Sequence, residues 1–248
     1  MAPASRRFLA VAVICCAGLV AGDSMRGISE LAETKDPAWP DVRAWVQNAK
    51  VPTEILPVVR RDGEKTLLAL QVTARSPMGA IALESGGILV DHGWIRVLGG
   101  GCRRMKATLS TWNALEGKTN GPPPPYLVVA YDAIGGFFAI NGGGLKGPPG
   151  HVFYFAPDAL DWVDLGTGYT GFLQAALQGK LASLYDGLRW SGWEREVGAA
   201  SPDQGYSFYP PLFTREGKGG ASRKLVPMTE LWSFEMETKR QLDAKEKP

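Results

Sequence analysis

The sequence is poor in the residues that bind zinc or form disulfides, with three cysteines and two histidines among 248 residues. Cys15 and Cys16 lie in an N-terminal apolar run, which leaves Cys102 as the one cysteine of the remaining chain. A single cysteine excludes a disulfide framework there. His92 and His151 are isolated in the sequence, so they do not supply the four ligands of a structural zinc site. We therefore predict no disulfide, no metal and no other cofactor.

The motifs of common enzyme classes are also missing: there is no G-x-S-x-G and no H-E-x-x-H. Gly142, Gly144 and Gly147 match the G-x-G-x-x-G string of dinucleotide-binding folds. In those folds a helix comes next, because its N-terminus binds the pyrophosphate, whereas a Pro-Pro-Gly run at 148–150 and a predicted strand follow here. The loop also lacks the Gly-Lys-Ser/Thr of a P-loop, so we interpret it as structural.

Neither sign of charge is in excess, since 27 Lys and Arg face 25 Asp and Glu, for a net charge of +2. Such a balance indicates neither nucleic acid nor an anionic membrane as partner. One basic cluster contains Arg215, Lys218, Arg223 and Lys224. It lacks the interleaved aromatic residues of nucleic-acid grooves, so we predict a solvated loop.

The first 24 residues differ from the rest of the chain. Arg6 and Arg7 precede an apolar run at 8–22, a layout typical of a signal peptide and shorter than the roughly 20 residues of a membrane span. This interpretation predicts an exported or periplasmic protein without a stable membrane span. Alternatively the start is misassigned, because Met25 opens a sequence that resembles a natural beginning, and the protein is then cytoplasmic.

The remaining sequence, 25–248, predicts one α+β domain. Glycine and proline are abundant, at 31 and 18 residues, and follow no period, which is typical of a loop-rich globular fold. Helical patterns come first, short β-rich runs with turn signals occupy the middle, and helical patterns close the chain. This order favours a central antiparallel sheet of hairpins packed by N-terminal and C-terminal helices. Because small isolated sheets are marginal, a single domain is preferred.

The expected elements follow from periodicity and from turn and cap residues. Ser76 and Pro77 predict a helix start, and Gly86 predicts its end in a left-handed conformation. Pro52 and Pro57 mark a connector, 207–213 is expected to be irregular and 214–224 a loop. Helices are predicted at 28–33, 39–46, 62–72, 78–85, 169–177, 181–188, 193–197 and 227–242, and strands at 87–90, 94–98, 126–131, 136–140, 152–155 and 162–165.

The leading functional hypothesis is a non-catalytic protein-binding domain, leaning away from an enzyme. Protein interfaces favour aromatic and arginine anchors. Asp91, His92, Trp94 and Arg96 lie on one predicted hairpin, and Asn141 opens the Gly-rich loop. We predict these five residues as a binding surface for a protein partner, although aromatic residues at the same positions are equally typical of a core. The oligomeric state is left open.

Two alternatives remain at this stage. The first is an enzyme with an unfamiliar, hydrolase-like site, in which Cys102, His92 and Asp91 act as nucleophile, base and orienting group, or Asp132 acts as an acid or base. An exposed turn histidine and an ordinary cysteine explain the same residues without catalysis. The second alternative is a small-ligand-binding protein, in which the ligand stabilises the native state.

Several strings of the sequence, spread over residues 25–242, carry a family resemblance. They lie at 36–40, 69–101, 135–145, 152–162, 185–193, 203–212 and 227–232. They resemble a bacterial family known as domain of unknown function 2625, which implies no activity and no catalytic residues. The order of a hairpin, a Gly-rich loop, a strand and a helix over 126–173 resembles, more weakly, the SUKH superfamily. That layout implies an immunity-like protein that binds a bacterial toxin, and it is an analogy of form.

Overall fold

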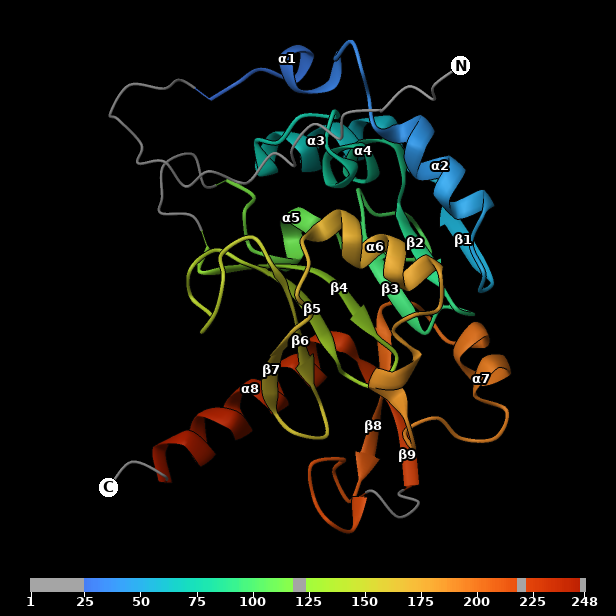
Figure 1. The fold of residues 1–248 in the computed structure, drawn as a ribbon, viewed down its shortest axis with the longest axis vertical. Coiled ribbons are helices and arrows are strands. Elements are labelled where there is room, and N and C mark those ends of the chain that lie inside the picture. The colour runs from blue at the N-terminus through green and yellow to red at the C-terminus, as the bar shows by residue number, and fades with distance from the viewer. Residues whose placement is uncertain (1–24, 118–123, 218–221, 246–248) are drawn as a thin grey trace, which may run out of the picture.

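The computed structural model describes residues 25–117, 124–217 and 222–245 (Figure 1). The signal peptide or false start predicted for residues 1–24 therefore lies outside the described residues, as does Lys218 of the basic cluster. The elements, in chain order, are α1 (Ile28–Ala32), α2 (Trp39–Gln47), β1 (Thr53–Leu56), α3 (Arg60–Leu70), α4 (Pro77–Glu84), β2 (Gly87–Val90), β3 (Ile95–Leu98), α5 (Leu109–Trp112), β4 (Tyr126–Asp132), β5 (Phe137–Asn141), β6 (Val152–Ala156), β7 (Asp161–Asp164), α6 (Tyr169–Leu177), the 3-10 helix η1 (Ala182–Tyr185), α7 (Trp193–Ala199), β8 (Gln204–Tyr209), β9 (Ser222–Pro227) and α8 (Met228–Lys245).

Seven strands form one antiparallel sheet in the order β1-β2-β3-β4-β5-β6-β7, so each strand pairs with its neighbour in the chain. Helices from both ends of the chain cover it, because Val42 of α2 and Leu231 of α8 belong to the same buried cluster as the strands. The prediction of an α+β fold with a central antiparallel sheet is confirmed. A separate two-stranded sheet pairs β8 with β9.

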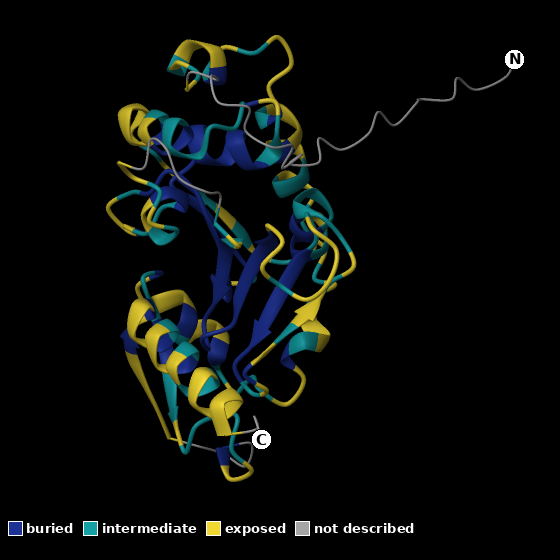
Figure 2. Ribbon diagram, turned by 90° about the vertical axis from the view of Figure 1, so that its left-hand side faces the viewer, coloured by how far each residue is buried: buried dark blue, intermediate teal, exposed yellow. Residues whose placement is uncertain are grey.

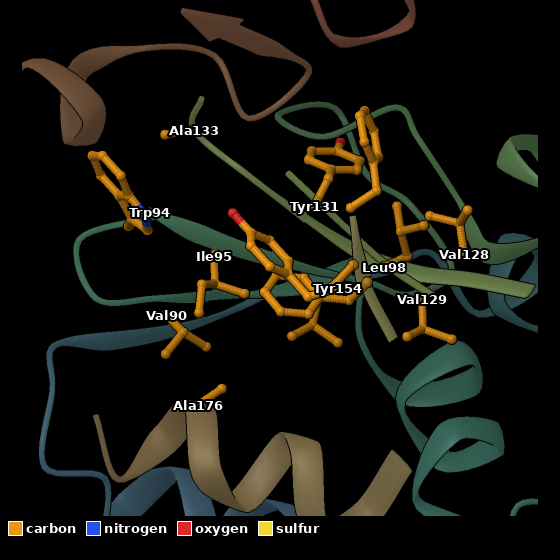
Figure 3. Packing of buried hydrophobic residues seen from close by; sticks show 14 of the residues in the cluster. Val90, Trp94, Ile95, Leu98, Val128, Val129, Tyr131, Ala133, Tyr154 and Ala176 are labelled. Carbon is orange, nitrogen blue, oxygen red and sulfur yellow. The ribbon is translucent and has the colours of Figure 1, made fainter. Parts of the chain in front are cut away.

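Both faces of the large sheet are buried in its centre, as Figure 2 shows by the dark strands between helices with exposed outer sides. Successive residues of a strand point to opposite faces. Phe138 packs on Phe172 of α6, with ring centroids 4.8 Å apart, and Phe137 packs on Trp232 of α8 at 4.6 Å. Neither phenylalanine is exposed. The α6 side of the sheet is seen in Figure 3, where Val90 and Ile95 point toward Ala176.

The hairpins and most helices form where the sequence predicts them. Ser76 accepts a hydrogen bond from the Gly79 N–H at 3.0 Å and Pro77 opens α4, as the cap signal indicates. The predicted left-handed end at Gly86 is wrong, because Ser85 is already extended and the positive φ, +141°, belongs to Gly87. Gly86 instead allows close packing, since a Cβ there would lie 2.8 Å from the Cβ of Cys102.

Four other predictions fail in detail. The connector between Pro52 and Pro57 contains strand β1, which pairs with β2. The segments predicted as irregular and as a loop contain half of β8 and the start of β9, which pair with Ser207 opposite Lys224. The helix predicted at 181–188 is limited to the single 3-10 turn of η1. In each strand the pairing partner supplies hydrogen bonds that local residue preferences do not reveal.

Candidate functional site

The structure separates the five predicted binding residues into exposed and buried ones. Asp91 and His92 form the turn between β2 and β3, with φ of +54° and +58°, and His92 is exposed. Trp94 is 0%, Arg96 1% and Asn141 1% exposed. Trp94 and Asn141 are covered by the fold, whereas Arg96 belongs to the lining of a cleft beside the turn. A binding surface made of all five residues stays a prediction.

Asn141 organises its own loop and lies away from the other four residues. Its Oδ1 accepts hydrogen bonds from the Gly143 and Leu145 N–H groups at 2.8 and 3.0 Å, and its Nδ2 donates to the Gly147 carbonyl at 3.0 Å. The antiparallel register puts Asn141 at the Tyr126 end of β4, whereas the turn with His92 lies at the opposite, Asp132 end. These bonds give Asn141 a complete structural role.

The topology keeps Cys102 apart from His92 and Asp91, the other two residues of the triad considered above. Cys102 packs beside Gly86, immediately before β2, and His92 lies just after its other end. Four strand residues at about 3.3 Å each separate the two by about 13 Å. Asp91 is also engaged elsewhere, because its Oδ2 accepts a hydrogen bond from Arg189 Nη2 at 2.6 Å. The structure therefore does not bring these three residues together as a nucleophile, base and orienting group.

Asp132, the other acid considered for catalysis, is enclosed. It is 0% exposed, and its Oδ1 accepts hydrogen bonds from the Ile134 and Gly136 N–H groups at 3.0 and 2.7 Å. Its Oδ2 accepts one from the Tyr154 hydroxyl at 2.8 Å. Burial raises the pKa of Asp132, and the hydrogen bonds oppose that rise. The carboxyl thus fixes the turn between β4 and β5 and is out of reach of a substrate.

A cleft of about 250 Å³ lies beside the β2–β3 turn and contains two of the predicted residues, His92 and Arg96. Its floor follows one row of the sheet, because the register sets Glu54 opposite Leu89 and Leu89 opposite Arg96. Cross-strand partners point to the same face. The lining comprises Pro52, Thr53, Glu54, Leu89, His92, Gly93, Arg96, Arg104, Val197, Gly198, Ala200 and Pro202.

Arg96 is the unusual residue of this cleft. Its Nε donates to the Gly93 carbonyl at 2.9 Å and its Nη1 to the Gln204 carbonyl, both uncharged acceptors. Its Nη2 is buried without a hydrogen-bond partner, and Arg96 forms no ion pair with any described residue. Burial lowers the pKa of Arg96, and nearby negative groups such as Asp132 oppose that change. A buried guanidinium without an ion-pair partner in direct contact is costly, and arginine keeps its charge.

Helix α7 forms one wall of the cleft and is fixed by a cluster of aromatic rings. The Arg189 guanidinium lies over the rings of Trp193, Trp94 and Tyr185, with Cζ 4.2, 4.8 and 5.2 Å from their centroids. The same guanidinium pairs with Asp91, and His92 meets Trp193 edge-on at 5.8 Å. Cation–π contacts and the ion pair therefore join the turn to α7.

Sequence reasoning missed the rest of the cleft. Glu54 pairs with Arg104 at 2.6 Å, and both side chains are half-exposed. Glu54 lies on β1, which the sequence analysis interpreted as a connector because prolines flank it. Nothing in the residues around Arg104 indicates a binding role. Val197 and Pro202 come from a segment about a hundred residues away, which no local pattern connects to the β2–β3 turn.

Residues 28–231 match the model of a family described as protein of unknown function DUF2625. The chain belongs to this family. A relative in Escherichia coli strain K12, the uncharacterised protein YbfG, is 39% identical over 215 residues, which cover 87% of this chain and 98% of that protein. An uncharacterised protein of Haemophilus influenzae is 35% identical over 189 residues, or 76% and 83% of the two chains.

The comparisons confirm the predicted family and supply no activity for it. No solved structure matches the chain, so the SUKH-like layout stays an analogy. Among the described residues, no helix combines the length and apolar character needed to cross a bilayer. Within the same residues, no three His, Cys, Asp or Glu side chains gather where a metal ion would bind.

Glu235 of α8 is a second buried group with an unmet hydrogen-bonding capacity. It is 4% exposed, and its Oε2 has no partner in the part of the chain that the structure describes. Its other oxygen lies against Gly135, where a side chain would collide with it. Burial raises the pKa of Glu235 well above its usual value, and Asp132 adds to the rise.

Replacing Glu235 by glutamine is expected to stabilise the protein at high pH. Below pH 4.5, the ordinary pKa, both the folded and the unfolded glutamate are protonated. Above it the unfolded form ionises first, so the native state loses stability until its own raised pKa is passed. Urea unfolding should show that the free energy of unfolding of E235Q exceeds that of the wild type by about 1–3 kcal/mol at pH 8. At pH 4 the two proteins should have similar free energies of unfolding. E230Q, an exposed change on the same helix, is the control, and a wild type more stable at pH 8 contradicts the prediction.

Proposed function

We propose that this protein is a non-catalytic binding domain whose cleft between the β2–β3 turn and α7 takes a carboxylate group. The observation that carries the proposal is Arg96, a buried guanidinium without an ion-pair partner among the described residues, in the lining of the cleft. A bound carboxylate would supply a counter-ion and an acceptor for Nη2. Charge-assisted hydrogen bonds between arginine and carboxylate are among the strongest in proteins.

The other charges of the cleft leave room for one negative group. Glu54 and Arg104 pair at 2.6 Å and cancel each other. The positive charge of Arg96 is therefore unbalanced within the lining, and a single carboxylate neutralises it. His92, at the exposed rim, adds a second hydrogen-bonding side chain.

The arrangement favours binding over catalysis. Asp91 pairs with Arg189 and so does not orient His92 as a general base. The Thr53 hydroxyl, another side chain of the lining, donates its hydrogen to the Val51 carbonyl at 3.0 Å. A nucleophile needs a base within hydrogen-bond reach. Recognition of a carboxylate needs only a fixed guanidinium in the lining of the cleft, and Arg96 supplies one.

The test measures ligand-induced stabilisation of the full chain. Small carboxylates and short peptides with a free C-terminus are expected to raise the melting temperature, while the same peptides with an amidated C-terminus are not. This comparison separates a free small acid from a protein-borne carboxylate. Arg96→Met should abolish the shift without unfolding the protein, because an apolar side chain of similar size replaces an unpaired charge.

Arg103→Met is the matched control, since Arg103 is exposed and lies outside the cleft lining. It should leave the ligand-induced shift intact. The proposal is wrong if no carboxylate stabilises the wild type, or if R96M responds as the wild type does. A response to free-C-terminal peptides alone would assign the cleft to a protein partner.

A further inference from the structure

The cleft has a charged end and an apolar middle. Arg96 lies at one end of the row on the sheet, Leu89 follows in the centre, and Glu54 stands at the other end. Neighbouring strands are about 4.8 Å apart, so the backbone positions of Arg96 and Glu54 are separated by about 10 Å. Leu89 is 6% exposed and forms the floor between them.

The walls above this floor are apolar as well. Val197 of α7 and Pro202 face the cleft from the segment after η1, and Pro52 borders it from the side of β1. Apolar surface of this kind stabilises a ligand in proportion to the apolar area removed from water. The half-exposed pair of Glu54 and Arg104 ends the apolar stretch.

We infer, on the basis of the proposed function, that the ligand is a small monocarboxylate with a short aliphatic tail, whose carboxylate meets Arg96 and whose tail lies over Leu89. The cleft of about 250 Å³ lies below the usual range of drug-sized sites, which limits the ligand to a small molecule. A second carboxylate at the far end would lose water and meet the Glu54–Arg104 pair, whose charges already offset each other, so a dianion is disfavoured. A peptide C-terminus places polar amide groups over the apolar floor and is disfavoured for that reason.

NMR titration of the full-length protein with acetate, butyrate, hexanoate, hexanamide and adipate tests the inference. Each methylene that the tail buries is expected to tighten binding about fourfold, until the tail reaches the Glu54–Arg104 pair. Hexanoate should therefore bind more tightly than acetate, and hexanamide and adipate more weakly than hexanoate. Equal affinities for acetate and hexanoate, or adipate binding as tightly as hexanoate, would overturn the inference and leave the proposed function standing. If no carboxylate of the series and no peptide binds, both fail.

A variant that narrows the cleft gives an independent readout. A side chain added at Gly198 would have the His92 carbonyl as its nearest neighbour, at 3.7 Å, so Gly198→Leu projects into the lining without a backbone collision. Leucine also favours the helix more than glycine does. G198L should weaken hexanoate binding about tenfold, as expected when one or two methylenes lose their place. Ala199 is exposed and lies outside the lining, so Ala199→Leu should leave hexanoate binding unchanged. Equal effects of the two variants would count against the placement of the tail.

Discussion

Replacing Trp94 by alanine is expected to lower the free energy of unfolding by about 3–5 kcal/mol. Trp94 is 0% exposed, and its ring lies 4.9 Å from that of Trp193 and 5.3 Å from that of Tyr185. It also lies under the Arg189 guanidinium at 4.8 Å. Alanine would leave a cavity lined by rigid aromatic rings that cannot collapse into it, and the cation–π contact would be lost.

Denaturant unfolding monitored by far-UV circular dichroism measures this loss. Trp94→Phe should cost less, because most of the apolar volume remains and the Trp94 Nε1 has no hydrogen-bond partner among the described residues. Tyr209→Ala is the control for removing an aromatic side chain, since Tyr209 is 78% exposed and should change stability by at most about 0.5 kcal/mol. A W94A protein within that range of the wild type would show that the aromatic cluster does not hold α7.

The sequence predicts those parts of the fold whose signals are local. The hairpins β2–β3 and β4–β5 follow from apolar runs separated by short turns, and Gly93, with φ of +82°, marks the first of these turns. Strands β1 and β8 were missed because their pairing partners are distant or lie beyond a Gly-rich segment. Thr53, for example, pairs with Val90, far along the chain. Local propensity carries no information about such partners.

The candidate site is predicted in part, for a similar reason. His92 and Arg96 are neighbours on a hairpin, so their shared position at the cleft follows from local structure. Trp94 was assigned to the same surface because aromatic residues are enriched at interfaces, yet they also fill cores. Arg96 also contacts the Gln204 carbonyl, although the two residues are 108 positions apart. Only the assembled fold shows that contact.

Removing the Asp132 carboxyl is expected to cost about 3 kcal/mol or more. Asp132→Ala would leave the Ile134 N–H, the Gly136 N–H and the Tyr154 hydroxyl without their acceptor in the fully buried turn between β4 and β5. Each buried polar group that loses its partner costs about 1–3 kcal/mol. The turn also cannot rearrange easily, because a side chain at Gly136 would collide with Asp132 and Tyr154.

Asp132→Asn tests whether the hydrogen bonds, and not the charge, hold this turn. The asparagine Oδ1 can still accept from Ile134 and Gly136, and its Nδ2 can donate to the Tyr154 oxygen, so the loss should fall to about 1 kcal/mol. Urea unfolding of both variants at one pH gives the comparison. Similar large losses in D132A and D132N would mean that the ionised carboxylate itself is required, and that the turn responds to charge. A small loss in both would show that the β4–β5 turn is held by the packing of Tyr154 and the neighbouring rings alone.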